Sequence, residues 1–146
     1  MIKGNVTSYL RRGFAALSIL LAALAGYGVA SASQEEGMLV RLSEIEIHPG
    51  DLEGYKAILK EEAAASVRLE PGVVSIFPMV EKERPTQVRI LEIYASREAY
   101  QAHLKTPHFQ KYKTTTLKMV KSLKLVDMES LDPGTMPLMF KKMTGQ

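Results

Sequence analysis

The stretch Leu91-Glu-Ile-Tyr-Ala-Ser-Arg-Glu-Ala-Tyr-Gln-Ala-His-Leu-Lys-Thr-Pro-His-Phe109 holds the end of one element and the starts of two others. Its first residues continue a run of branched and aromatic side chains that predicts a strand over residues 87–94. Ser96 suits the N-cap of a short helix. Thr106 followed by Pro107 predicts the start of another helix, because threonine caps well and proline is tolerated at the first helical position.

Strands and helices are predicted on both sides of this stretch. Three further strands are expected over residues 38–47, 73–80 and 123–128, and a helix capped by Asp51 runs to about Arg68. The apolar stripe of that helix, spaced by three and four, is Leu52, Tyr55, Ile58, Leu59, Ala63 and Val67. The helix that begins after Thr106 is expected to end near Ser122. The order βαββαβ predicts a ferredoxin-like α+β fold, an antiparallel four-stranded sheet with both helices on one face.

The predicted sheet is apolar on both faces. Leu39, Ile45 and Ile47 alternate to one side of the first strand, while Val40 and Leu42 point to the other. Helices can cover only one of these faces, and a large uncovered apolar face promotes association. We therefore expect a homodimer that packs sheet against sheet. Pro78 cannot donate to a strand ladder, so its strand is expected at an edge or at a bulge.

The N-terminus has the pattern of an export signal. Residues 1–32 contain three basic residues and no acid, then an apolar run, then Val29-Ala-Ser-Ala32 with small residues suited to cleavage. We expect a signal peptide over 1–32, a linker over 33–37, the folded domain over 38–130 and a tail over 131–146. The protein would then be periplasmic or secreted. The alternative is an uncleaved inner-membrane anchor over 14–32, and Arg11-Arg12 fits either general or twin-arginine export.

Charge and cysteine content exclude several kinds of site. Of 19 basic and 16 acidic residues, three basic ones lie in 1–32, which leaves 16 of each sign in the rest. We expect no nucleic-acid partner, because phosphate binding needs an excess of basic residues. The chain has no cysteine, which excludes disulfides, thiolate metal sites and cysteine nucleophiles.

The ordered segments resemble the antibiotic biosynthesis monooxygenase family, whose members form dimeric α+β barrels. The matching pieces are Ser43-Glu-Ile45, His48-Pro-Gly50, Arg68-Leu-Glu-Pro-Gly72 and, above all, Leu91–Phe109. The resemblance covers about Leu39 to Met128 and is greatest to the small quinol monooxygenases of the family. It implies oxidation of phenols or quinols by molecular oxygen without flavin, haem or metal. A haem-degrading relative is disfavoured, because the chain has no tryptophan.

His103 and His108 are the candidate catalytic residues. A cofactor-free oxygenase must deprotonate its substrate, and histidine suits this near neutral pH. We hypothesise that one histidine is the base and the other orients the substrate oxygen; the alternative is that both are packing or capping residues. A metal site is the second interpretation of the same pair, but we predict no metal, because the histidines are five residues apart and no acid near them in the sequence completes a ligand set. The resemblance implies that no cofactor is needed, and the sequence agrees only in that no dinucleotide-binding or P-loop motif is present.

Five further residues are candidate substrate-binding residues. Glu44 and Glu92 lie in strands predicted to be central, where either could receive a substrate proton, or could instead pair with a neighbouring arginine. Ser75, Phe77 and Tyr94 could line a pocket for a ring, or could be ordinary core.

The sequence therefore predicts an exported, homodimeric monooxygenase-like enzyme that acts on a small aromatic or quinol. The alternative is a non-catalytic ligand-binding or stress-related protein with the same barrel, since fold alone does not establish function. A partner protein tethered to the membrane is a third possibility if the signal is retained.

Overall fold

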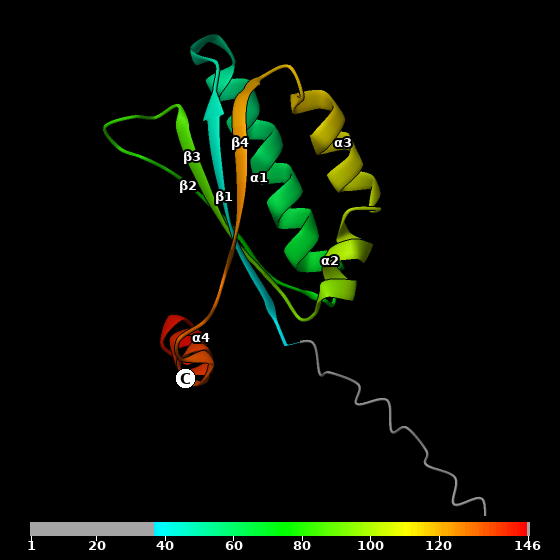
Figure 1. The fold of residues 1–146 in the computed structure, drawn as a ribbon, viewed down its shortest axis with the longest axis vertical. Coiled ribbons are helices and arrows are strands. Elements are labelled where there is room, and N and C mark those ends of the chain that lie inside the picture. Colours follow the sequence, from blue (N-terminus) through cyan, green and yellow to red (C-terminus); the bar gives the residue numbers. More distant parts are fainter. Residues whose placement is uncertain (1–36, 146) are drawn as a thin grey trace, which may run out of the picture. The chain divides into compact units, whose positions relative to one another are not determined.

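The computed structural model describes residues 37–145 (Figure 1). The predicted signal peptide and all but the last residue of the predicted linker lie outside the described residues. Within 37–145, no helix is both long enough and apolar enough to cross a membrane.

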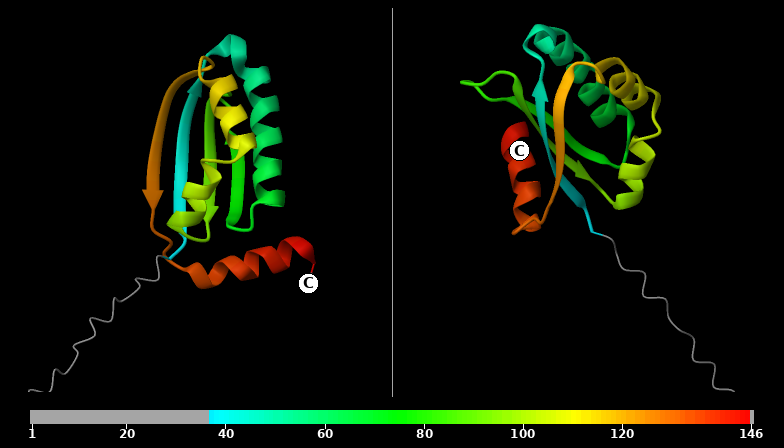
Figure 2. Two further views of the ribbon diagram at one scale, coloured as in Figure 1. Left: turned by 90° about the vertical axis from the view of Figure 1, so that its right-hand side faces the viewer. Right: turned by 45° about the horizontal axis from the view of Figure 1, so that its top comes forward.

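The predicted order of elements is confirmed. Four antiparallel strands pair in the order β2-β3-β1-β4, and α1, α2 and α3 cover one face of the sheet (Figures 1 and 2). We call the opposite face of the sheet its outer face. The elements are β1 (Leu39–Ile47), α1 (Leu52–Leu69), β2 (Val73–Val80), β3 (Gln87–Tyr94), α2 (Arg97–His103), α3 (Pro107–Thr116), β4 (Val120–Met128) and α4 (Met136–Thr144), with 3-10 turns at Pro49–Asp51 and Pro133–Thr135.

The core lies between the sheet and α1. Alternate residues of β1, from Leu39 to Ile47, are buried on the helix-covered face, as the alternation predicts. The apolar stripe of α1 is confirmed at Tyr55, Leu59 and Ala63. It is wrong at Val67, which is 46% exposed. In the last turns of α1 the buried polar side chains are Glu62 and Ser66, and the Ser66 hydroxyl donates a hydrogen bond to the Glu62 carboxylate.

β2 is an edge strand, as Pro78 predicts. Its pairing with β3 shifts by one residue between Val73 and Ser75. Because side chains alternate between faces, one extra residue moves all later side chains of the strand to the other face. Ser75 and Phe77 therefore pair beside Ile93 and Leu91 on the outer face.

Two predicted element boundaries are corrected. α3 ends at Thr116 rather than near Ser122, and β4 begins at Val120 rather than at Leu123. The extra strand residues pair with the end of β1 across a bulge between Glu46 and Ile47, which hydrophobic periodicity cannot reveal.

Two of the three predicted helix caps are confirmed. Ser96 accepts a hydrogen bond from the Ala99 amide, and Thr106 accepts one from the Phe109 amide. Asp51 makes no side-chain cap, because it closes a 3-10 turn that leads into α1.

Gly72, immediately before β2, packs closely against α2. A Cβ atom built on Gly72 would lie 2.5 Å from the Cβ of Ala99, so the start of β2 touches α2 directly.

The tail, for which hydrophobic periodicity predicted no structure, contains α4. The apolar residues Leu138, Met139, Phe140 and Met143 of α4 are all exposed.

Candidate functional site

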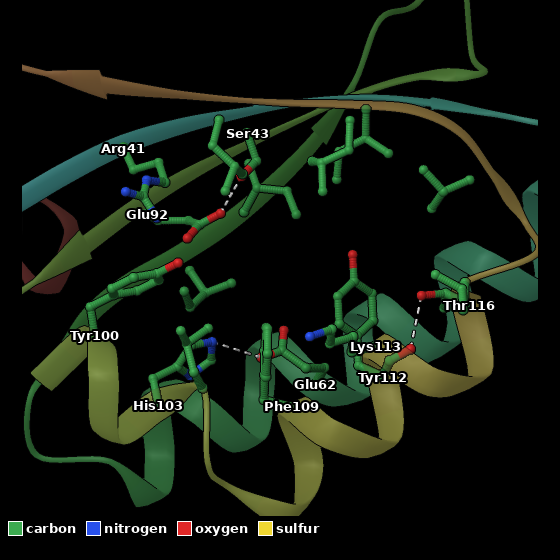
Figure 3. A pocket seen from close by; sticks show the side chains of 18 of the residues that line it. Arg41, Ser43, Glu62, Glu92, Tyr100, His103, Phe109, Tyr112, Lys113 and Thr116 are labelled. Atoms are coloured by element: carbon green, nitrogen blue, oxygen red, sulfur yellow. Dashed lines mark hydrogen bonds and ion pairs between the residues drawn. The ribbon is translucent and has the colours of Figure 1, made fainter.

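An open cavity of about 610 Å³ lies between the sheet and the helices. Side chains from β1 and β3 enter it from the sheet, and side chains from α1, α2 and α3 enter it from the opposite wall (Figure 3). Most of its lining is apolar or aromatic, including Tyr100, Phe109 and Tyr112. Its size is that of a small-molecule site, for which about 300–1,000 Å³ is usual.

The carboxylate of Glu92 lies on the sheet side of this cavity. Ser43 Oγ donates to Glu92 Oε1 at 2.5 Å, and Tyr94 Oη donates to Glu92 Oε2 at 2.8 Å. Burial, together with the neighbouring carboxylate, raises the pKa of the Tyr94 hydroxyl, so it stays protonated and remains a donor. Two donors therefore hold the carboxylate in one orientation.

Arg41 lines the same end of the cavity as a fixed cation. Its guanidinium carbon lies 4.5 Å from the centre of the Tyr100 ring, and its Nη2 lies 2.6 Å from Asp127 Oδ1. An aromatic face and a carboxylate thus share this buried charge.

His103 forms part of the helix wall and is only 2% exposed. Its Nδ1 lies 3.0 Å from Glu70 Oε1, and its Nε2 lies 3.7 Å from Glu62 Oε1. Glu62 is buried and also accepts a hydrogen bond from Ser66. Burial raises the pKa of Glu62, an effect that the nearby Ser66 and His103 oppose.

His108 does not line the cavity. Its Nε2 lies 2.6 Å from Glu70 Oε1, the same oxygen that His103 contacts. Burial would raise the pKa of Glu70, but the hydrogen bonds with the two histidines hold it below its ordinary value. The sequence-based premise that no acid accompanies the histidines is therefore wrong. Glu70, 33 residues before His103, joins them, and the three could hold a metal ion.

The model of the antibiotic biosynthesis monooxygenase family matches residues 38–115. The chain belongs to this family. The resemblance predicted from the sequence is thereby confirmed, and with it the ferredoxin-like fold.

Solved structures agree with this assignment. A protein from Bacteroides thetaiotaomicron, described as a candidate antibiotic biosynthesis monooxygenase, is 55% identical with a TM-score of 0.67, and the match covers 68% of this chain and 95% of that one. A candidate monooxygenase from Lactobacillus acidophilus is 31% identical with a TM-score of 0.63, over 64% of this chain and 45% of that one. A candidate antibiotic biosynthesis monooxygenase from Nitrosomonas europaea is 23% identical, with a TM-score of 0.63, over 67% of this chain and 94% of that one, which shows the shared fold alone. No curated protein matches the chain.

The structure of this family member brings together three of the seven predicted site residues. Glu92, Tyr94 and His103 line the cavity. Ser75 and Phe77 lie on the outer face for the reason given above, and so does Glu44, which pairs beside Arg89 and lies 3.9 Å from Lys124. His108 lies behind His103, where it contacts Glu70.

Sequence reasoning missed several cavity residues of this monooxygenase-family protein. Ser43 could have been found from the alternation of side chains in β1, because it lies on the same face of the strand as Ile45. Glu62 could have been found from its position in the α1 stripe, three residues after Leu59. The others that were not singled out are Arg41, Tyr100, Phe109, Tyr112 and Lys113.

Proposed function

We propose that this protein oxidises a small phenol or quinol with molecular oxygen and without a cofactor. The observation that carries the proposal is a mostly apolar cavity lined by aromatic side chains, with the Glu92 carboxylate held in place on its sheet side. An apolar lining with a few fixed polar groups suits a ligand that is mostly ring and carries one or two oxygens.

The reaction needs an electron-rich substrate. Removing the proton of a ring hydroxyl gives a phenolate, which can transfer electrons to oxygen. One oxygen atom then enters at a ring carbon to give the quinone level, and the other leaves as water with the two hydrogens that the substrate loses. In this proposal Glu92 accepts the hydroxyl proton, since its carboxylate is an acceptor held on the sheet side of a mostly apolar cavity.

His103 is the histidine proposed to contact the substrate. Its Nε2 is 3.7 Å from Glu62, too far for a full hydrogen bond, so it is available to orient a substrate oxygen. His108 is proposed to act only through Glu70, because it does not line the cavity. Tyr100, Phe109 and Tyr112 would hold the ring between them.

The test is oxygen consumption by the purified chain with a panel of quinols and polycyclic phenols. Consumption that depends on substrate, and that falls in His103→Ala more than in His108→Ala, supports the proposal. Tight binding of the same compounds without oxygen consumption would instead support a non-catalytic binding protein.

We also propose that the protein is a homodimer that packs through the outer face of the sheet. Phe77 is 58% exposed there, and Met79 and Met128 are also exposed on that face. Specific interfaces bury about 1,200–2,000 Å² in total, which a sheet face can supply.

Phe77→Asp is expected to convert this dimer into a monomer, because it places a charge within the proposed apolar contact. Light scattering after size-exclusion chromatography measures the change. Leu69→Asp is the matched control, since Leu69 is 69% exposed at the end of α1, away from the outer face, and should leave the dimer intact. A wild-type monomer at micromolar concentration would contradict the proposal.

We further propose that the protein is exported and cleaved after Ala32, a proposal that rests on the residue pattern of 1–32 alone. Expression with the N-terminus intact in a bacterial host should give a periplasmic protein whose mass corresponds to a start at Ser33. An intact mass in the membrane fraction would show instead that residues 14–32 are an anchor.

A further inference from the structure

Three potential ligand atoms converge on one point beside the cavity. His103 Nδ1 and His108 Nε2 both contact Oε1 of Glu70, at 3.0 and 2.6 Å. The three atoms lie within 4.8 Å of one another. Two donors to one carboxylate can each take a separate oxygen, but here both nitrogens point at the same one. The three side chains therefore present their potential ligand atoms to one small volume.

The three side chains come from three elements that hold them in place. Glu70 follows the last residue of α1, and its amide donates to the Ser66 carbonyl. His103 is the last residue of α2, and His108 lies in the first turn of α3. Thr106, between the two histidines, caps α3 and donates from its hydroxyl to the His103 carbonyl at 2.8 Å. The packing of these elements therefore fixes the positions of the three potential ligand side chains.

The charge around this cluster favours a cation. The ion-pair partners of Glu62 and Glu70 within residues 37–145 are both imidazoles, and neither carboxylate pairs with a lysine or an arginine there. Both carboxylates are largely buried, and burying a carboxylate is costly unless a positive charge accompanies it. A cation bound between the imidazoles and the carboxylate would supply that positive charge.

We propose that Glu70, His103 and His108 bind a divalent transition-metal ion, with zinc as the best fit. Two imidazole nitrogens and one carboxylate oxygen are a common ligand set for zinc, with water as the fourth ligand. Metal–ligand bonds of about 2.0–2.1 Å need ligand atoms about 3.3 Å apart. The present separations of 2.6 and 3.0 Å are shorter than that value by a few tenths of an ångström, so the side chains must move apart slightly to admit the ion.

The surroundings of His103 match those of a metal ligand. A metal-bound imidazole usually donates its other N–H to a carboxylate, which fixes the ring and its tautomer. The Nε2 of His103 faces Glu62, which Ser66 holds in turn at 2.7 Å. His108 and Glu70 retain side-chain exposures of 19% and 11%, which leaves a path for the ion and its water.

This site shares only His103 with the proposed substrate cavity: His103 would bind the ion through Nδ1 and face the substrate through Nε2. Glu70 and His108 do not line the cavity, so the ion would not meet the substrate. It would instead fasten the end of α1 to the corner between α2 and α3. The inference therefore holds whether or not the chain oxidises phenols.

The experiment is calorimetric titration of the purified, chelator-treated full chain with Zn²⁺, with Co²⁺ as a spectroscopic probe. We expect one ion per chain, visible Co²⁺ absorption bands of a four-coordinate site, and a melting temperature raised by roughly 10 °C at a hundredfold excess over Kd. Replacing a carboxylate that supports a bound imidazole costs about 10–100-fold in metal affinity. Loss of a ligand in His108→Ala or Glu70→Gln should cost at least about a hundredfold.

His48→Ala is the matched control, because His48 is the third histidine of the chain and lies exposed in the turn after β1. It should bind Zn²⁺ like the wild type. Circular dichroism confirms that each variant is folded, and His108 is chosen over His103 because it is less buried. The proposal is overturned if the wild type binds no stoichiometric ion up to about 100 μM. It is also overturned if folded His108→Ala and Glu70→Gln bind as tightly as His48→Ala.

Discussion

Glu92→Gln is expected to lower kcat/KM for oxygen-dependent phenol oxidation by about two to four orders of magnitude, the usual contribution of a positioned general base. Glutamine has nearly the same shape, and its carbonyl oxygen can still accept the hydrogen bond from Ser43. What it loses is the negative charge, the ability to take a proton and the second acceptor oxygen, to which Tyr94 donates. Oxygen consumption with the best substrate of the panel measures the effect.

Glu53→Gln is the control for this prediction. Glu53 is an exposed residue of α1 that pairs only with Lys56 among the described residues, so its loss of charge should leave activity within a factor of about two. Unchanged folding of Glu92→Gln by circular dichroism is needed for the comparison. If Glu92→Gln and Glu53→Gln oxidised the substrate equally fast, Glu92 would not be the base.

Tyr55→Ala is expected to lower the free energy of unfolding by about 3–5 kcal/mol, the usual cost of deleting a buried aromatic ring. Tyr55 is fully buried in the core, and its hydroxyl lies 2.7 Å from that of Tyr112 on α3. The substitution therefore removes both a large part of the core and a link between α1 and α3. Equilibrium unfolding in urea measures the change.

Two further variants separate these contributions. Tyr55→Phe keeps the ring and loses only the hydrogen bond, so it should cost about 0.5–1.5 kcal/mol. Leu69→Ala, at an exposed position of the same helix, should change stability by no more than about 0.5 kcal/mol. A Tyr55→Ala cost similar to that of Leu69→Ala would mean that the contact between α1 and the sheet is not the core of the domain.

The limits of a strand were predictable wherever turn or helix-capping residues flank it. Residues 73–80 and 87–94 form β2 and β3 with the predicted bounds, because Pro71-Gly72 precedes one strand and Ser96 starts a helix after the other. The start of β4 was not predictable, because it depends on a bulge opposite Glu46 and Ile47 that only the paired strand reveals.

The site was predictable where alternation continues unbroken. Glu92 and Tyr94 lie two residues apart in β3 and share the cavity face. Ser75 and Phe77 would share that face with Val73, but the register shift after Val73 moves them to the outer face. Glu70 could not be assigned from spacing, because its contact with the histidines forms only when α1 packs beside α2 and α3.

The contact between Gly72 and Ala99 has a consequence for how this domain can change in evolution. The space there admits one methyl group, and the side chain at position 99 already fills it. Across the family, an alanine at position 72 should be found together with a glycine at position 99, so that the two positions covary. The order of substitution matters as well: a lineage avoids the clash only if Ala99→Gly comes first, and that step itself costs about 0.5–1 kcal/mol because glycine is unfavourable in a helix.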